Sequence, residues 1–299
     1  MMLDRMEGNA ELKASVRQML ASRRLTHSVL LVGEAGLGAG FAARCIAADY
    51  LYPAGGAPAE AMLRGECCRA VAKAGKRDSG QIETGIVREA ISVTGMGSGG
   101  KYLVGQVTAM RSEIFNTSLS AEGRAVLLYH VERMNEESAN ALLKVMEEPP
   151  EGVLFLLTAD SLASVLPTIR SRCVSFAVAP VSPADCTRYC AAQGVDQKTA
   201  ALYSELFDGH IGTVLAVARD EARTAQVEKA LELARAAAAL LTDFRAVAAA
   251  GLRSSPRAPV QGTQARQAVR LADAALQRLG AQVNPKVVLS VFAAKLRTL

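Results

Sequence analysis

The chain has 299 residues, of which 50% are hydrophobic and 21% charged; this composition is typical of a folded protein and excludes an intrinsically disordered chain. Aromatic residues make up only 4% and Trp is absent, so a surface that stacks nucleobases on aromatic rings is hard to build. The net charge of +5 is mild and is concentrated after residue 222, where Lys and Arg outnumber Asp and Glu. This bias permits contact with phosphates or with an acidic protein and proves neither.

No part of the sequence has the character of a membrane segment. The first residues contain no apolar signal core, and no stretch reaches the roughly 18 uninterrupted apolar residues that a membrane span needs. The most Ala-rich part, around residues 230–252, is interrupted by charged side chains. We therefore expect a cytoplasmic protein without membrane contact, whose six Cys are reduced thiols.

Helices and apolar strands alternate along the first 180 residues. Residues 10–24 have the period of an amphipathic helix, and the apolar strand 28–32 follows. A Gly-rich turn then leads into a second helix that ends near residue 50, whereas the Pro- and Gly-rich residues 53–80 are predicted to form a loop or a small excursion. The later predicted elements are a helix at 104–118, a strand at 124–129, a helix from the cap Asn135 to Glu148, a strand at 153–158, a short helix, and a strand at 174–178. Continuous apolar strands between helices predict an α/β fold with a parallel sheet covered on both faces.

After Pro180 the pattern changes to helices only. Ser182 to Asp185 form a capping box with Pro at the first helical position, which predicts the first of three short helices within 182–219. A long Ala-rich helix follows Glu221, and after a break at 254–260 two further helices are expected at about 262–280 and 284–297. The predicted domains are thus 1–180, 181–220 and 221–299.

The turn after the first strand has the position and frame of a phosphate-binding loop, G-x-x-x-x-G-K-[ST]. Gly33, Gly36 and Gly38 are present, but Ala39 and Gly40 stand where the Lys and the hydroxyl residue belong. Such a loop can offer N–H groups to an anion, yet a triphosphate without the Lys and an organised Mg²⁺ should bind weakly and hydrolyse hardly at all. A plain tight Gly turn explains the same residues.

A dinucleotide site is an alternative interpretation of this turn. Residues 38–43 match G-x-G-x-x-A, which in dinucleotide-binding folds is followed by a second strand that ends in an acidic residue about 20 positions on. The residues at that distance, Pro53 to Glu60, do not read as a strand. The pattern therefore argues against this alternative.

Three motifs in the same order and spacing resemble the AAA+ subunits of bacterial clamp loaders. Leu127 to Asn135 stand where that family has its Walker B strand, and Ala139 to Pro150 resemble the family's NALLKxLEEPP helix. Residues 166–173 resemble the SRC motif. The resemblance covers about residues 5–220, and it implies an AAA+ domain, a small helical lid and an all-α collar.

Within the family, the chain is most similar to the delta-prime type of DNA polymerase III subunit. Tyr129 and His130 replace the two acids of Walker B, of which one would hold Mg²⁺ and the other would polarise the attacking water. Thr213 stands where active subunits have a lid arginine. The resemblance therefore implies a subunit whose own ATPase site is inactive, and His130 is interpreted as a partnered residue at the edge of the core.

The resemblance assigns one reactive role to this chain. In the family the arginine of SRC, here Arg172 between Ser171 and Cys173, projects into the ATP site of a neighbouring subunit. A planar, permanently charged guanidinium suits charge developing on a γ-phosphate. Arg170 is a candidate second contact, and the Thr158 hydroxyl is expected to cap the next turn. A solvated arginine at a helix end is the plain alternative for Arg172.

No metal site is expected from the cysteines. Many relatives carry a four-Cys zinc module before Walker B, but this interval holds only the adjacent Cys67 and Cys68 and no His. Cys186 and Cys190, one helical turn apart, are expected to be packed core residues. We therefore expect no bound zinc and no functional cofactor, with ATP bound only by neighbouring subunits.

The resemblance implies a role in DNA replication as a subunit that helps load the sliding clamp onto primed DNA. Its expected partners are the gamma/tau motor and delta subunits and, through the complex, the clamp and primer–template DNA. The alternatives are an active ATPase motor of the same complex, a P-loop scaffold outside replication, and an NAD(P)-dependent enzyme.

Overall fold

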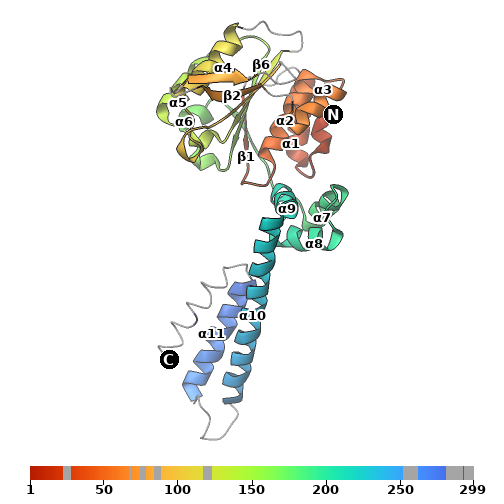
Figure 1. The fold of residues 1–299 in the computed structure, drawn as a ribbon, viewed down its shortest axis with the longest axis vertical. Helices are drawn as coiled ribbons and strands as arrows, with labels where there is room; N and C mark the ends of the chain where they lie inside the picture. Colours follow the sequence, from red (N-terminus) through yellow and green to blue (C-terminus); the bar gives the residue numbers. More distant parts are fainter. Residues whose placement is uncertain are drawn as a thin grey trace. The chain divides into compact units, whose positions relative to one another are not determined.

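The computed structural model describes residues 1–22, 28–66, 69–74, 79–83, 89–116, 123–251, 262–280 and 292. These residues form two compact units, Met1–Leu215 and Ala216–Leu299 (Figure 1). The domain boundary expected at residue 180 falls inside the first unit, and the one expected at residue 220 lies close to the start of the second. Both boundaries stay predictions.

The described residues of the first unit contain a seven-stranded sheet with the order β3-β2-β4-β5-β6-β1-β7. Neighbouring strands are parallel, except that β3 runs antiparallel to β2 at one edge. The strands are β1 (Ser28–Val32), β2 (Arg69–Ala74), β3 (Ser79–Glu83), β4 (Ala90–Thr94), β5 (Arg124–Tyr129), β6 (Val153–Ala159) and β7 (Val174–Ala177). The predicted α/β class with a largely parallel sheet is confirmed.

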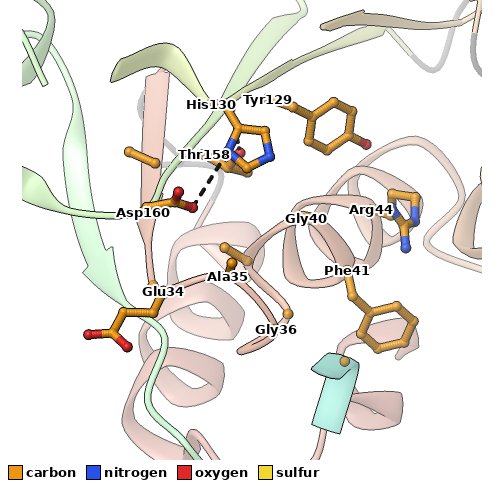
Figure 2. Close-up of a pocket in the computed structure, with 15 residues that line it drawn as sticks. Glu34, Ala35, Gly36, Gly40, Phe41, Arg44, Tyr129, His130, Thr158 and Asp160 are labelled. Atoms are coloured by element: carbon orange, nitrogen blue, oxygen red, sulfur yellow. Dashed lines mark hydrogen bonds and ion pairs between the residues drawn. The ribbon is translucent and has the colours of Figure 1, made fainter. Parts of the chain in front are cut away.

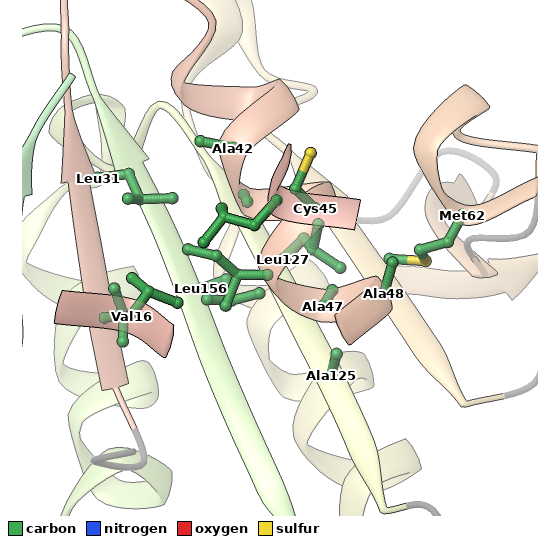
Figure 3. Close-up of a cluster of buried hydrophobic side chains, with 14 of the residues drawn as sticks. Val16, Leu31, Ala42, Cys45, Ala47, Ala48, Met62, Ala125, Leu127 and Leu156 are labelled. Atoms are coloured by element: carbon green, nitrogen blue, oxygen red, sulfur yellow. The ribbon is translucent and has the colours of Figure 1, made fainter. Parts of the chain in front are cut away.

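Helices cover both faces of this sheet (Figure 1). Successive residues of β1 point to opposite faces: Val29 and Leu31 join the core that includes α1 and α2, and Leu30 joins the core that includes α4 and α5. Figure 3 shows the first core, where small side chains of α2 lie against Leu127 and Leu156. The helices are η1 (Met2–Arg5), α1 (Ala10–Ala21), α2 (Ala39–Leu51), α3 (Ala57–Arg64), η2 (Ser98–Gly100), α4 (Val104–Asn116), η3 (Val131–Arg133), α5 (Glu136–Glu147), η4 (Leu162–Ser164) and α6 (Pro167–Arg170).

The prediction of a loop at residues 53–80 is wrong. This stretch contains α3 and β2, and β3 begins at its end. Pro58 lies in the first turn of α3, where its missing N–H costs nothing, so a residue read as a loop marker starts a helix instead. The strands β2 and β3 were missed because their short, mixed sequences have no strand period. β4 was missed for the same reason, although it pairs with β5 inside the sheet.

The predicted caps are present. Asn135 accepts a hydrogen bond from the Ser138 N–H at 2.9 Å and so starts α5. Ser182 accepts one from the Asp185 N–H at 3.1 Å and starts the helices that follow the sheet. These are α7 (Pro183–Ala192), α8 (Gln197–Leu206) and α9 (Ile211–Ala218), and Cys186 and Cys190 of α7 are fully buried as expected.

In the second unit two long helices pack against each other. They are α10 (Glu221–Gly251) and α11 (Gly262–Gly280), with Leu241 and Ala275 buried between them. The Phe244 and Phe292 rings meet edge to face with centroids 5.3 Å apart. The expected break at 254–260 and most of the expected last helix at 284–297 lie outside the described residues. None of the helices in the described part of the chain has the length and apolar character that a membrane span requires.

Candidate functional site

A pocket of about 410 Å³ opens where the carboxyl ends of β1, β5 and β6 meet the first turn of α2 (Figure 2). Ligands of parallel α/β sheets bind at this edge, because the strand ends and helix N-termini converge there. The pocket contains all five P-loop residues and both Walker B residues that the sequence singled out. Its lining is Gly33, Glu34, Ala35, Gly36, Gly38, Ala39, Gly40, Phe41, Arg44, Tyr129, His130, Thr158, Ala159, Asp160 and Gly212.

The loop from Gly33 to Gly40 has kept the backbone frame of a phosphate-binding turn. The Gly33 N–H bonds to the Ala159 carbonyl at 3.0 Å, which ties the loop to the end of β6. Gly36 and Gly38 both have φ +94°, a conformation that residues with a Cβ rarely adopt. Ala39 and Gly40 then form the first turn of α2, so neither a cation nor a hydroxyl stands where the motif places them.

The start of α9 rests directly on this loop. The Gly212 N–H bonds to the Gly36 carbonyl at 2.8 Å. A methyl group at Gly36 would collide with the Thr213 hydroxyl, so the two segments are in van der Waals contact. Thr213 therefore packs against the loop at the position where a lid arginine was expected from active subunits.

Tyr129, the last residue of β5, faces the first turn of α2 (Figure 2). A Cβ placed at Gly40 would lie 3.3 Å from Tyr129 Cε1 and 3.9 Å from an Arg44 guanidinium nitrogen. The aromatic ring thus lies beside the first turn of α2, at the strand end from which the sequence pattern predicts that a Walker B carboxylate would hold Mg²⁺. A phenol is a poor ligand for that ion.

His130 is placed by its backbone and is surrounded by acids. It adopts a left-handed conformation with φ 58°, and its N–H bonds to the Thr158 hydroxyl at 3.1 Å. Its Nδ1 lies 3.2 Å from Glu132 Oε1 and 3.5 Å from Asp160 Oδ1. The expectation that His130 is partnered is confirmed, whereas the Thr158 hydroxyl bridges β6 to β5 instead of capping a turn.

Sequence reasoning missed Arg44, Glu132 and Asp160. Arg44 lies four residues after Gly40 on α2, its Nε donates to the Leu63 carbonyl at 2.8 Å, and its guanidinium carbon lies 5.8 Å from the Phe41 ring centroid. The i, i+4 spacing from Gly40 is the signal that predicts its place on the same helix face. The two acids follow the adjacent strands β5 and β6, whose carboxyl ends meet.

Arg172 lies away from this pocket, just beyond α6, with its side chain 36% exposed. One guanidinium nitrogen is 2.5 Å from Glu147 Oε1 at the end of α5, and another donates to the Thr168 carbonyl at 3.0 Å. Ser171 donates its hydroxyl to the same carbonyl at 3.1 Å. The arginine is therefore held at the surface by the Glu147 carboxylate, the Thr168 carbonyl and the Ser171 hydroxyl oxygen. Arg170, the candidate second contact, is also exposed.

Cys173 supports this segment from the core side and is not a reactive group. It packs against the core formed with α4 and α5, and burial raises the pKa of its thiol to about 12. At neutral pH the thiol is therefore protonated. Cys67 and Cys68, on which the expectation of no zinc module rests, lie outside the described residues.

The family model and the sequence relatives described next are all subunits of DNA polymerase III. The family model described as DNA polymerase III, delta subunit matches residues 8–182. A delta-prime subunit of DNA polymerase III from Pseudomonas aeruginosa is 34% identical over 150 residues, which cover 50% of this chain and 42% of that protein. The corresponding subunit of Bacillus subtilis is 29% identical over 160 residues, covering 54% of this chain and 44% of that protein.

A DNA polymerase III gamma subunit is similar as well. The protein of Buchnera aphidicola from Acyrthosiphon pisum is 26% identical over 175 residues, covering 58% of this chain and 44% of that protein. The chain thus matches less than half of the length of each of these relatives. The family model covers more than half of this chain, and its residues span the sheet and the pocket. The chain therefore belongs to the DNA polymerase III delta-subunit family, in which it is similar to delta-prime subunits.

Proposed function

We propose that this chain is a non-hydrolysing clamp-loader subunit that works through its neighbours. It assembles with gamma/tau motor subunits and a delta subunit, and the complex loads the sliding clamp onto primer–template DNA. The chain itself needs no cofactor for this role, because the ATP and Mg²⁺ are bound by the motor subunits. Its part is to hold the geometry of the assembly and to present Arg172 to the ATP of an adjacent subunit.

The observation that carries the proposal is the first turn of α2. Ala39 and Gly40 stand where a charged amine and a metal-binding hydroxyl would be needed, and the Tyr129 ring lies against Gly40. Thr213 and Gly212 cover the loop at Gly36. Phosphoryl transfer depends on a positioned amine and a metal ion, so a pocket that has neither the P-loop amine nor the metal-binding hydroxyl has little means to stabilise the transition state.

The geometry of Arg172 supports a role in trans. Its pair with Glu147 is exposed on both sides, with 36% and 51% of the side chains accessible. Exposed pairs of this kind contribute only about 0–1 kcal/mol to stability. A phosphate group, which offers charged oxygens in the fork geometry that a guanidinium prefers, can therefore replace the carboxylate at little cost.

The proposal predicts that Arg172→Ala lowers the DNA-stimulated ATPase of the reconstituted complex by about tenfold or more, because arginine fingers stabilise transition-state charge. Assembly, measured by size-exclusion chromatography with multi-angle light scattering, should be unchanged. Glu147→Gln is the matched control: it removes the same ion pair but keeps the guanidinium, so activity should be retained. Equal ATPase rates for the parent and Arg172→Ala complexes would remove the finger role.

The second candidate function is that of an active motor subunit, and the similarity to a gamma subunit supports it. The two candidates differ in what the isolated chain does with ATP and Mg²⁺. A non-hydrolysing subunit should show no turnover above that of a buffer blank, measured as phosphate release at micromolar protein. Rapid turnover by the purified chain would favour the motor instead.

A further inference from the structure

We propose that His130, Glu132 and Asp160 form a binding site for one zinc-class divalent cation at the edge of the pocket. The expectation from the sequence was that the chain holds no metal, and neither acid had been singled out. The proposal is independent of ATP hydrolysis and of the Cys67–Cys68 pair. It rests on three ligand atoms that the fold brings together from the ends of two neighbouring strands.

Two of the three distances between the ligand atoms suit a tetrahedral ion. One ligand atom from each residue lies within 4.8 Å of the other two. His130 Nδ1 is 3.2 Å from Glu132 Oε1 and 3.5 Å from Asp160 Oδ1. Zinc bonds to nitrogen and oxygen of about 2.0–2.1 Å separate tetrahedral ligands by about 3.3 Å, so these two edges need almost no adjustment.

Glu132 provides a second observation through the packing of its carboxylate. Its side chain is only 12% exposed, and its Oε2 atom is buried without a hydrogen-bond partner among the described residues. A buried carboxylate oxygen normally has a partner, because leaving it unpaired in a low-dielectric environment is costly. Its Oε1 already contacts His130 and lies 3.8 Å from Arg133 Nε. A cation bound between the three residues would neutralise the Glu132 carboxylate, which the described residues leave incompletely paired.

The site is also held in place by the fold. His130 follows β5 and Asp160 follows β6, and these strands are paired in parallel from Arg124 with Val153 to Leu128 with Leu157. The His130 N–H is bonded to the Thr158 hydroxyl on β6, which limits movement of the imidazole. Both His130 and Asp160 line the pocket (Figure 2), so the fourth position faces open space where water or an anion can bind.

The ligand set selects the class of ion. One imidazole with two carboxylates and an open position suits Zn²⁺, and the two negative charges balance its charge. Mg²⁺ is a weaker candidate because it prefers six oxygen ligands in near-ideal octahedral geometry. A protonated His130 that bridges the two acids is the metal-free alternative, and it would produce the same contacts.

The experiment is a titration of the full chain with ZnCl₂ by isothermal titration calorimetry, carried out with Cys67→Ser and Cys68→Ser so that those thiols cannot bind the ion. We expect one zinc per chain, and tetrahedral Co²⁺ absorption bands without a thiolate band when CoCl₂ is used. His130→Asn and Glu132→Gln should each weaken zinc binding by about 100-fold or more, since even outer partners of metal ligands matter 10- to 100-fold. Asn tolerates the left-handed backbone at residue 130, so this variant is expected to fold.

His210→Gln is the matched control, because His210 Nε2 lies 3.7 Å from a single carboxylate oxygen, that of Glu34. This variant should bind zinc like the parent. Zinc at about 100 times its Kd should also raise the parent's Tm by roughly 5–10 °C, and should not raise that of Asp160→Asn. No zinc binding, or equal affinities for the parent and His130→Asn, would overturn the proposal in favour of the metal-free ion pair.

Discussion

At the scale of single residues, neutral or partnered side chains stand at positions where the nucleotide-site motif has charged groups. Ala39 is buried at the start of α2, and Tyr129 fills space beside Gly40. These substitutions are visible in the sequence because the motif assigns a role to each position. The sequence does not show which residues each replacement contacts. The local sequence pattern also did not predict that His130 lies close to Asp160.

Buried thiols give a residue-scale prediction about alkaline pH. Burial raises the pKa of Cys45 from 9.0 to about 12, with the Asp49 carboxylate as a second cause. The folded state therefore holds this proton more tightly than the unfolded state. Its contribution is complete below pH 9 and is lost as the pH rises toward 12, at up to about 1.4 kcal/mol per pH unit.

The measurement is the urea midpoint of unfolding between pH 8 and pH 9.5, where tyrosines with an ordinary pKa of about 10 are still mostly protonated. The midpoint of the parent should fall as the pH rises above 9. Cys45→Ala should be less stable overall because it leaves a small cavity, but its midpoint should decline less steeply. If the urea midpoints of the parent and Cys45→Ala fall equally steeply with pH, the raised pKa of Cys45 does not contribute to stability as predicted.

At the scale of elements, the start of α9 packs against the loop after β1 and closes one side of the pocket. The Gly212 N–H and the Thr213 hydroxyl both meet Gly36, so the start of α9 lies where the loop turns. This contact joins segments about 175 residues apart in the chain. The local sequence pattern correctly predicted the glycine turn after β1 and the helix α9. It gave no information that the two are in contact.

Two glycine substitutions separate backbone strain from this contact. Gly36 and Gly38 share a φ of +94°, but a Cβ at Gly38 has Phe41 Cβ at 3.9 Å as its nearest neighbour, whereas one at Gly36 collides with Thr213. Gly38→Ala should cost about 1–2 kcal/mol from strain. Gly36→Ala should cost about 1–3 kcal/mol more from overpacking.

Urea unfolding of both variants measures the difference, and Thr213→Ala should recover part of the extra loss in Gly36→Ala. If Gly36→Ala and Gly38→Ala lose the same free energy of unfolding, α9 moves away from the loop without a loss of stability.

At the scale of the whole molecule, the second unit presents an apolar face that the chain itself leaves exposed. Leu233 and Leu240 of α10 are 58% and 65% exposed, and their spacing of two helical turns places them on one face. Leu241, by contrast, is buried against α11. Helical subunits of an assembly can bury such a face against one another, in agreement with the proposed collar.

Leu240→Glu should therefore weaken assembly with gamma/tau and delta subunits by about tenfold or more, because it places a charge in an apolar interface. The Tm of the isolated chain should change little, since exposed substitutions usually stay within about 0.5 kcal/mol. Thr242→Glu adds the same charge at an exposed position on another face of α10, and should assemble normally. Sedimentation velocity of each variant mixed with gamma/tau and delta subunits measures assembly. If Leu240→Glu assembles fully, this face is not part of the interface.

The sequence alone determined most strands and helices of the chain, because apolar period, caps such as Asn135 and Ser182, and glycine turns act over a few residues. It also determined the loss of the P-loop amine and hydroxyl, since a motif fixes the role of each position. It did not yield α3, β2, β3 or β4, whose short sequences have no clear period.

Only the tertiary structure decided which distant residues meet. Arg172 with Glu147, Thr213 with Gly36, and His130 with Asp160 are pairs separated by 25 to 177 residues. Such pairs arise from the order and register of the strands and from how helices pack on them. Those are properties of the whole sheet, set by the burial of its two faces, and no local stretch of sequence specifies them.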